Sequence, residues 1–384
     1  MPRHLNARFI LLGGASILVG CGSIGAGRSS ATSPVQQEDA VAGSAAEQIN
    51  TYHSRFGREQ PVIAVVGVNS GTELTDYVIP YGVLRRAGVG EVLAVATRPG
   101  PMTMRPALRI QPQATIAEFD ARFPDGADYV VVPAVVDRTD PALLQWIKAQ
   151  AAKGSTLVSI CDGALVLAGS GVLDGHRATA HWATEGYRRK AYPQVRWVND
   201  RRYVADGKIV SSAGISAAIP TSLALVEAIA GRKRAAAVAA DMGVREWSPI
   251  HDSQRFHPKL GRNLSAFATT QYLNGWFHHP QSVGIPVEDH VDEVSLALTA
   301  DAYTRSGRTH AYAVSTSQAP VQSLHGLTLL PERSGTQALQ RTVSVPAGKP
   351  AMALDRALSD IARLYGRQTA FGVALDFEYP GYNG

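Results

Sequence analysis

The chain has 384 residues and a formal net charge of +5, with 45% hydrophobic and 18% charged residues. This composition excludes fibrous and wholly disordered chains, and at about 150 residues per domain the length allows two domains or one large one. No apolar run reaches the ~20 residues of a membrane-spanning helix, the basic cluster Arg232–Arg234 is too short to predict nucleic-acid binding, and two cysteines are too few for a disulfide scaffold.

The N-terminus has the layout of a secretory signal. Three basic residues precede an apolar stretch at residues 9–20, which ends in Leu-Val-Gly-Cys at Cys21 and resembles a bacterial lipobox. We expect residues 1–21 to be a lipoprotein signal peptide with Cys21 as the lipidated residue; an ordinary cleaved signal is the alternative. Residues 22–58 are rich in Gly, Ser, Ala and Gln, which predicts a flexible tether.

These features predict an extracytoplasmic protein that its N-terminal lipid anchors to a bacterial membrane. The residue after Cys21 is Gly22, and the aspartate that would retain the protein at the inner membrane is absent from that position. In a cell with two membranes, we therefore expect the outer one.

Residues 59–234 alternate between strand and helix patterns. Apolar runs that are typical of buried strands occur at residues 62–68, 91–97, 108–110, 129–133 and 155–160. Helical spacing or caps predict helices at residues 76–87, 141–152, 163–168 and 216–230. Segments 196–204 and 208–212 flank a hairpin signal. This alternation predicts an α/β domain with a doubly wound, mostly parallel sheet.

Cys161 directly follows the strand at 155–160 and precedes the helix at 163–168. A nucleophile at such a turn needs a small neighbour, which Gly163 supplies, and the helix N-terminus favours the thiolate. The backbone N–H of Asp162 would then meet a developing oxyanion. The alternative is a small buried hydrophobic cysteine, and the local sequence leaves both open.

The segment from Cys161 to Trp182 reads CDGALVLAGSGVLDGHRATAHW and resembles the ThiJ/PfpI superfamily. It is most similar to the branch of isonitrile hydratases and of the ligand-sensing domains of AraC-type regulators. Within it, residues 173–182 resemble that branch's Leu-Asp-Gly…Ala-Thr-x-His-Trp stretch, residues 76–88 resemble its first helix, and residues 212–217 resemble its Ser-Ala-Gly turn. The resemblance spans about residues 60–232 and implies a glutamine-amidotransferase-like, flavodoxin-like fold with a cysteine nucleophile elbow.

The resemblance also implies roles for individual residues. Cys161 would be the nucleophile and Asp76 the acid that shares a proton with it. His181 lies where relatives place a histidine near the site, either as a catalytic base or as a structural histidine against Trp182. The carboxylate of Asp162 would either face the pocket and select a polar or cationic ligand, or cap the helix.

One departure from the family pattern concerns the oxyanion site. Many relatives carry Pro-Gly-Gly after the fourth strand, and its backbone N–H groups line that site. Here the strand ends in Pro133-Ala134-Val135. The N–H of Ala134 would take that place, and the β-branched Val135 does not readily adopt positive φ, so we expect the oxyanion hole to be reshaped or lost.

The C-terminal region, residues 235–384, shows no helix-turn-helix pattern. Residues 292–331 align loosely with residues 76–112, Asp292 with Asp76 at an offset of 216 and Leu327 with Leu108 at an offset of 219. Either this is chance or the region is a degenerate second copy without a cysteine, serving as a dimer mimic or a lid. The patterns also predict a helix at 351–365 and a strand at 370–377.

Five histidines occur in residues 241–290, but their spacing fits no standard metal site, and adjacent His278 and His279 would point to opposite sides of a strand. We expect a long interdomain loop there, no metal and no cofactor.

Two functions remain. The first is a cysteine-dependent hydrolase or hydratase in which Cys161 attacks a small carbon–nitrogen or carbonyl compound. The second is a membrane-tethered module that binds a small ligand or senses oxidants through its thiol. A DNA-binding regulator is disfavoured by the signal sequence, so no nucleic-acid partner is expected, whereas a homodimer is left open.

Overall fold

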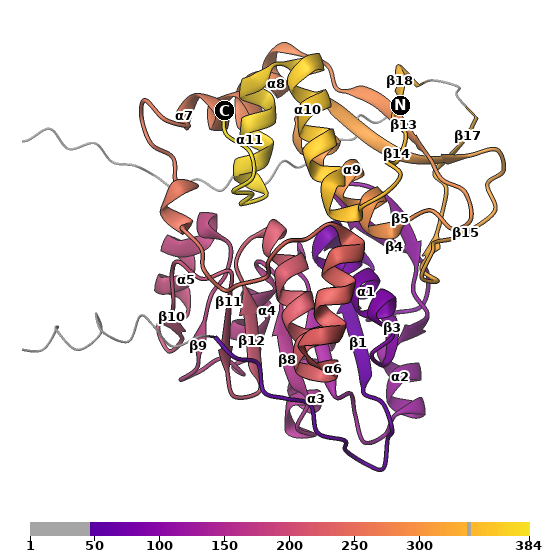
Figure 1. The fold of residues 1–384 in the computed structure, drawn as a ribbon, viewed down its shortest axis with the longest axis vertical. Coiled ribbons are helices and arrows are strands. Elements are labelled where there is room, and N and C mark those ends of the chain that lie inside the picture. Colours follow the sequence, from indigo (N-terminus) through magenta and orange to yellow (C-terminus); the bar gives the residue numbers. More distant parts are fainter. Residues whose placement is uncertain (1–46, 336–338) are drawn as a thin grey trace, which may run out of the picture. The chain divides into compact units, whose positions relative to one another are not determined.

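The computed structural model describes residues 47–335 and 339–384 (Figure 1). The expected signal peptide, Cys21 and most of the expected tether lie outside these residues. The described end of that tether, residues 47–58, packs on the domain instead. The backbone N–H of Tyr52 donates to the Ala228 carbonyl at 2.9 Å, and the buried carboxylate of Glu47 pairs with Arg177 at 2.6 Å. These residues therefore belong to the folded unit.

A seven-stranded sheet forms the centre of the first domain, in the order β11-β12-β8-β7-β1-β3-β6. Neighbouring strands are parallel except β11 and β12, which form the expected hairpin. Their bounds are β1 Val62–Gly67, β3 Glu91–Ala96, β6 Ala114–Thr115, β7 Tyr129–Val132, β8 Thr156–Ser159, β11 Tyr203–Asp206 and β12 Ile209–Ser212. The predicted α/β, doubly wound, mostly parallel fold is confirmed.

Helices cover both faces of this sheet. One face carries α1 Leu74–Ala87 and α6 Ala218–Met242, and the other carries α2 Ile116–Arg122, α3 Pro141–Ala152 and α4 Gly163–Gly169. The remaining elements of the domain are β2 Ser70–Glu73, β4 Met102–Arg105, β5 Arg109–Gln111, β9 Arg177–Ala178, β10 Arg196–Trp197 and α5 Glu185–Ala191. The expected strand at 196–204 is thus split between β10 and β11.

Helix α6 extends beyond the expected end at residue 230. Gly231, at φ 82°, interrupts it, and the chain continues helically to Met242. By length and composition alone, this helix could cross a membrane, but 67% of its apolar window is buried, as in a core helix.

The C-terminal region contains a second, smaller parallel sheet in the order β17-β14-β13-β18. Its strands are β13 Gln281–Pro286, β14 Thr309–Ser315, β17 Arg333–Ser334 and β18 Arg341–Thr342, with β15 Val321–Gln322 and β16 Thr328–Leu329 nearby. Its helices are α7 Leu264–Ala268, a π-helical turn Thr269–Leu273, α8 Asn274–Phe277, α9 Glu293–Arg305, α10 Ala353–Tyr365 and α11 Arg367–Asp376.

Two expectations for this region are wrong. The expected strand at 370–377 lies largely in helix α11, because Ala370, Val373, Ala374 and Phe377 are all buried and follow helical spacing. The expected loop at 241–290 holds four short helical segments, one of them a 3-10 turn at Ser253–Arg255, and β13. In the described part of the chain, no group of three His, Cys, Asp or Glu side chains gathers that could hold a metal ion.

The elements of the two regions correspond at a constant offset. The first residues of β13, α9, β16 and β17 follow those of β1, α1, β5 and β6 by 219 residues each: 281 − 62, 293 − 74, 328 − 109 and 333 − 114. The strand orders β18-β13-β14-β17 and β7-β1-β3-β6 also correspond. At this offset Asp292 matches Glu73, since both precede a helix, and Ser295 matches Asp76. The expected match of Asp292 with Asp76 is therefore wrong by one helical turn.

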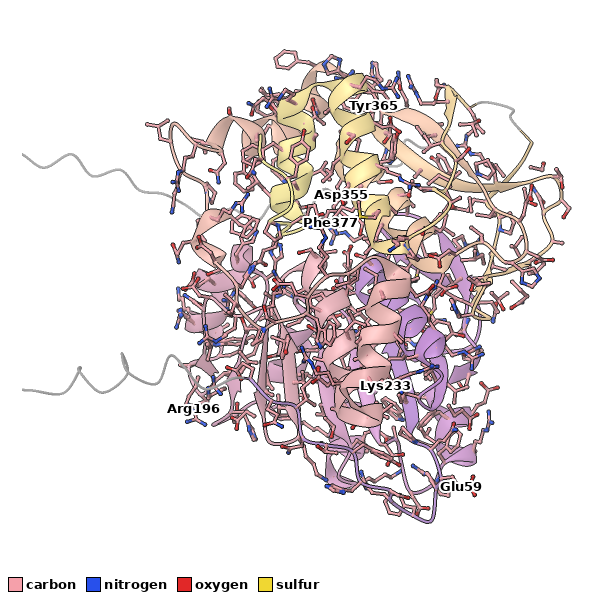
Figure 2. All side chains as sticks on the ribbon, in the orientation of Figure 1. Glu59, Arg196, Lys233, Asp355, Tyr365 and Phe377 are labelled. Atoms are coloured by element: carbon pink, nitrogen blue, oxygen red, sulfur yellow. The ribbon has the colours of Figure 1, made fainter. Side chains whose placement is uncertain are left out.

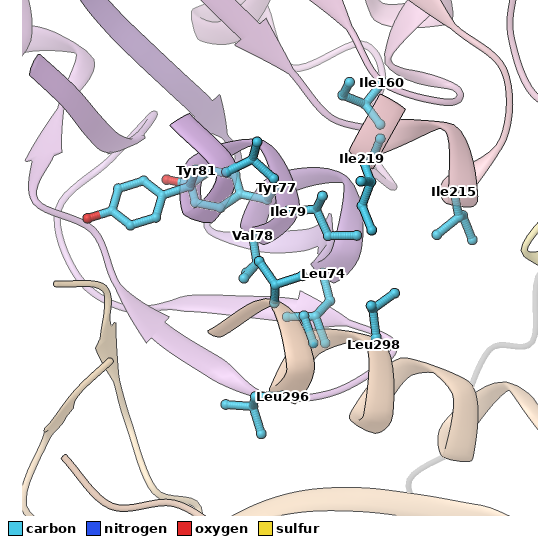
Figure 3. Packing of buried hydrophobic residues seen from close by; sticks show 14 of the residues in the cluster. Leu74, Tyr77, Val78, Ile79, Tyr81, Ile160, Ile215, Ile219, Leu296 and Leu298 are labelled. Carbon is cyan, nitrogen blue, oxygen red and sulfur yellow. The ribbon is translucent and has the colours of Figure 1, made fainter. Parts of the chain in front are cut away.

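The two regions share one hydrophobic core. Helix α1 packs against α9, and Figure 3 shows Leu74 and Val78 of α1 near Leu296 and Leu298 of α9. Strand β5 pairs antiparallel with β16 within a five-stranded sheet of order β15-β16-β5-β4-β2. This packing brings residues of the C-terminal region to the carboxyl end of the central sheet, where Cys161 lies.

Candidate active site

Cys161 sits in a strained turn between β8 and α4. Its φ is 55°, a left-handed conformation that non-glycine residues rarely adopt and that is concentrated at functional sites. A Cβ on Gly163 would overlap the carbonyl oxygen of Val132, so only glycine fits there. The Cys161 N–H donates to the hydroxyl of Ser212 at 3.1 Å. The structure thus has a tight strand-to-helix turn at Cys161, the position expected from the sequence.

Asp76 lies in the first turn of α1 and is fully buried. Its Oδ2 accepts a hydrogen bond from the backbone N–H of Ala134 at 3.1 Å. Its Oδ1 has no hydrogen-bond partner in the described structure. A buried carboxyl oxygen without a hydrogen bond costs about 1–3 kcal/mol of folding free energy. Oδ1 is therefore an atom at which a proton or a bound ligand would be stabilising.

The backbone donors do not form the expected oxyanion hole. The N–H of Ala134 is taken by Asp76, and the N–H of Asp162 hydrogen-bonds the Cys161 sulfur, which lowers the pKa of that thiol. The Ala134 N–H is therefore occupied by Asp76, and the Asp162 N–H is occupied by the sulfur of Cys161.

Burial sets the protonation of this pair. It raises the pKa of Asp76 well above its usual range, and the negative charge of Glu73 raises it further. Burial also raises the pKa of Cys161, as do the charges of Asp76, Asp162 and Glu73. Because the charge of each group opposes ionisation of the other, Asp76 and Cys161 titrate as a coupled pair that holds its protons to higher pH than the isolated groups would.

His181 is 7% exposed, and both ring nitrogens are engaged. Nε2–H donates to the carbonyl oxygen of Asp376 at 2.9 Å, and Nδ1 accepts from the N–H of Ala183 at 3.2 Å. The ring centroid lies 5.4 Å from that of Trp182. These contacts match the structural alternative for His181, since a base role would require the bond to Asp376 to break.

Asp162 does not cap α4 with its side chain, so the capping alternative is wrong. Its Oδ1 accepts a hydrogen bond from the hydroxyl of Thr184 at 2.8 Å. Burial raises the pKa of this carboxyl, while the nearby His181 lowers it.

The C-terminal region contributes residues that sequence reasoning missed. Arg305 at the end of α9 pairs with Glu73, with Asp301 at 2.5 Å and with Asp376 at 2.6 Å. Its partner Glu73 is 232 residues away in sequence. An arginine at a helix end carries no signal of such a contact, because only the tertiary packing creates it.

The chain after α11 covers the site. Phe377 is fully buried and lies where the yellow C-terminal segment meets the first domain in Figure 2. The carboxylate of Glu378 accepts from the N–H of Gly214 at 2.6 Å and contacts His251 at 2.7 Å. Cys161 itself is only 6% exposed. Any molecule that reaches the sulfur requires this segment or the turns around it to move.

The first domain is similar to known proteins. Residues 62–228 match the model of the DJ-1/PfpI family. The chain is 36% identical over 141 residues to the HTH-type transcriptional regulator CdhR of Pseudomonas aeruginosa, covering 37% of this chain and 42% of that protein. It is 32% identical over 158 residues to the isonitrile hydratase of Pseudomonas putida, covering 40% of this chain and 65% of the hydratase. The matches therefore span less than two thirds of either relative.

Among solved structures, the chain resembles the crystal structure of Drosophila melanogaster DJ-1beta. The identity is 24% and the TM-score 0.44, with 48% of this chain and 98% of that chain covered.

Proposed function

We propose that this protein is a cysteine-dependent hydrolase or hydratase that acts on a small carbon–nitrogen or carbonyl compound, since residues 62–228 match the DJ-1/PfpI family model. The observation that carries the proposal is Cys161 in its strained turn together with the buried carboxyl of Asp76, whose Oδ1 is unpartnered and whose charge acts on the thiol. The isonitrile hydratase among the relatives supports a carbon–nitrogen substrate class.

In this proposal, Asp76 is the base that the thiol needs. A raised pKa makes its carboxylate a stronger base near neutral pH than an ordinary aspartate. When the sulfur forms a bond to the electrophilic carbon, its proton passes to Oδ1. With an isonitrile, Asp76 returns this proton to the attacked carbon, which gives a thioimidate. With an amide, Asp76 returns the proton to the nitrogen, and the amine leaves as the carbon–nitrogen bond breaks, which gives a thioester.

Water completes the reaction. It adds to the carbon that carries the sulfur, the carbon–sulfur bond breaks, and the thiol of Cys161 regains a proton. The N–H of Asp162, which already contacts the sulfur, stabilises the negative charge that forms on the sulfur when the carbon–sulfur bond breaks.

The test is turnover of amides, isonitriles and small aldehydes by the wild-type protein and by Cys161→Ala and Cys161→Ser variants. Conversion that disappears in both variants supports the enzyme. Binding of one of these compounds with unchanged affinity in Cys161→Ala, without conversion in the wild type, would replace the enzyme with a binding module.

That binding or oxidant-sensing module is the second candidate function. Two observations favour it: Cys161 is enclosed, and a transcriptional regulator is among the relatives. Its ligand would be a small molecule that reaches the sulfur after the covering segment moves.

The proposal also includes the location. The signal-like residues 1–21 and Cys21 support a lipid-anchored, extracytoplasmic protein, on the outer membrane where the cell has two. Metabolic labelling with a radioactive fatty acid should mark the wild-type chain and leave a Cys21→Ser variant unlabelled. Equal labelling of both would contradict the anchor.

A further inference from the structure

The contacts between the two regions are reciprocal. Arg305 pairs with Glu73, and Arg86 pairs with Asp292. Since 305 − 86 and 292 − 73 are both 219, each ion pair is the counterpart of the other.

The same rule holds for the strands that join the regions. Ile110 of β5 is paired with Leu329 of β16, and 329 − 110 is again 219, so each residue meets its own counterpart. In a two-fold symmetric dimer, residue i contacts residue j and j contacts i. The chain therefore reproduces within itself the contact pattern of two identical subunits.

The two arginines differ in their surroundings. Arg86 bridges Asp241, whose side chain is 60% exposed, and Asp292. Arg305 is surrounded by Glu73, Asp301 and Asp376, next to the Cys161 centre. Its positive charge lowers the pKa of Asp76, against the effects of burial and of Glu73.

We infer that the C-terminal region is a second copy that occupies the place of a partner subunit, and that its Arg305 is a positioning residue for the Cys161–Asp76 centre. The inference rests on the proposed function for the role of that centre. The second copy carries no cysteine and has Ser295 where the first has Asp76. What it supplies is a buried cation that holds Glu73 in place and balances the acids around the sulfur.

Several charged and titratable groups face this centre. From the first domain and the C-terminal region together they are Glu73, Asp76, Arg105, Arg138, Asp162, His181, Arg188, Asp301, Arg305 and Asp376. Among the basic groups, Arg305 is the one that pairs with Glu73, Asp301 and Asp376. Removal of its guanidinium should therefore make these acids hold protons to higher pH.

The test measures the rate at which iodoacetamide alkylates Cys161 as a function of pH, with Cys21→Ser as the background so that Cys161 is the single thiol. The proton-loss step assigned to Asp76 should appear as an inflection in this profile. We expect Arg305→Gln to move the inflection to higher pH by about one unit, which is a tenfold change in the proton affinity. Arg305→Lys, which keeps the charge, should restore most of the wild-type profile.

Arg86→Gln is the matched control, because it removes the counterpart ion pair away from the sulfur. It should lower stability like Arg305→Gln and leave the alkylation profile unchanged. If Arg86→Gln and Arg305→Gln lower stability equally and neither changes the alkylation profile, Arg305 only holds the two regions together. That result would overturn its assignment as a positioning residue.

A third variant covers the case in which Arg305→Gln does not fold. Glu73→Gln removes a charge that raises the pKa of Asp76, so the inflection should move to lower pH, and an unmoved inflection would overturn the inference.

If the C-terminal region occupies the place of a partner subunit, light scattering should show one chain per particle. A stable dimer formed through α1 would contradict this. Alkylation needs no substrate, so a shift without any turnover would leave this inference standing while the proposed enzyme fails.

Discussion

The backbone N–H of Ala134 donates to Oδ2 of Asp76 at 3.1 Å. This bond ties the acid in α1 to the turn after β7, directly beside the elbow. It fixes which carboxyl oxygen stays free: Oδ1 is the atom without a partner in the described structure. The turn that holds Asp76 is the one where many proteins of the similar family carry Pro-Gly-Gly, whereas this chain has Pro133-Ala134-Val135.

The elbow should depend on the absence of a side chain at Gly163. In Gly163→Ala, the new methyl group overlaps the Val132 carbonyl, and we expect a loss of about 1–3 kcal/mol in the free energy of unfolding. Gly186 is the control, because a Cβ there meets no atom within 4 Å and it lies in helix α5. Urea denaturation should show Gly186→Ala as neutral or stabilising. Equal losses in the two variants would contradict the close packing of the elbow.

The shared core should make the two regions unfold together. Leu298 on α9 is 2% exposed, and Leu298→Ala should cost about 2–5 kcal/mol. Leu260 is 89% exposed, and its alanine variant should change stability by less than about 0.5 kcal/mol. We expect coincident urea transitions by tryptophan fluorescence and far-UV circular dichroism. Two separate transitions in the wild type would show that the regions fold independently.

Stability should fall as the pH rises from about 4 towards 7. Burial raises the pKa of Asp301 to about 7 in the folded chain, whereas an unfolded aspartate titrates near 3.9. Between these values the unfolded chain has lost a proton that the folded chain still holds, so proton loss favours unfolding.

Asp301→Asn should flatten this dependence in urea titrations, and the exposed Asp125→Asn should leave it as in the wild type. A wild-type slope that persists unchanged in Asp301→Asn would rule out this carboxyl as its source.

His181 should matter for packing rather than for proton transfer. His181→Gln loses the bond to the Asp376 carbonyl, for which we expect a cost of about 1 kcal/mol. The pH profile of Cys161 alkylation should keep its shape. A profile that loses an inflection in this variant would make His181 a base after all.

The sequence allowed much of the first domain to be predicted. Asp140 before Pro141 marks the start of α3, and the structure begins and ends that helix at the expected residues. The elbow was readable because Cys161 and Gly163 follow an apolar strand directly. These features are local, so a short window of sequence contains their cause.

The C-terminal region was harder to predict for physical reasons. The segment after Thr369 is apolar, with Phe371, Val373 and Phe377 that suit a strand, and burial among α7, α9 and α10 decides for a helix. Arg305 gave no signal because its partner Glu73 is distant in sequence. Two offsets fit the sequence, 216 for Asp292 and 219 for Leu327, and the bounds of the helices and strands decide for 219.

The central claim is that Asp76 and Cys161 share a proton, and the pH dependence of Cys161 alkylation in Cys21→Ser tests it most directly. Once Asp76 has lost its proton, its charge opposes ionisation of the thiol, so the wild-type rate should level off above that pH. In Asp76→Asn this charge is absent, and the rate should rise about tenfold per pH unit, without the plateau, up to the pKa of the thiol. Identical profiles in the two proteins, or no labelling of the wild type until it unfolds, would contradict the account.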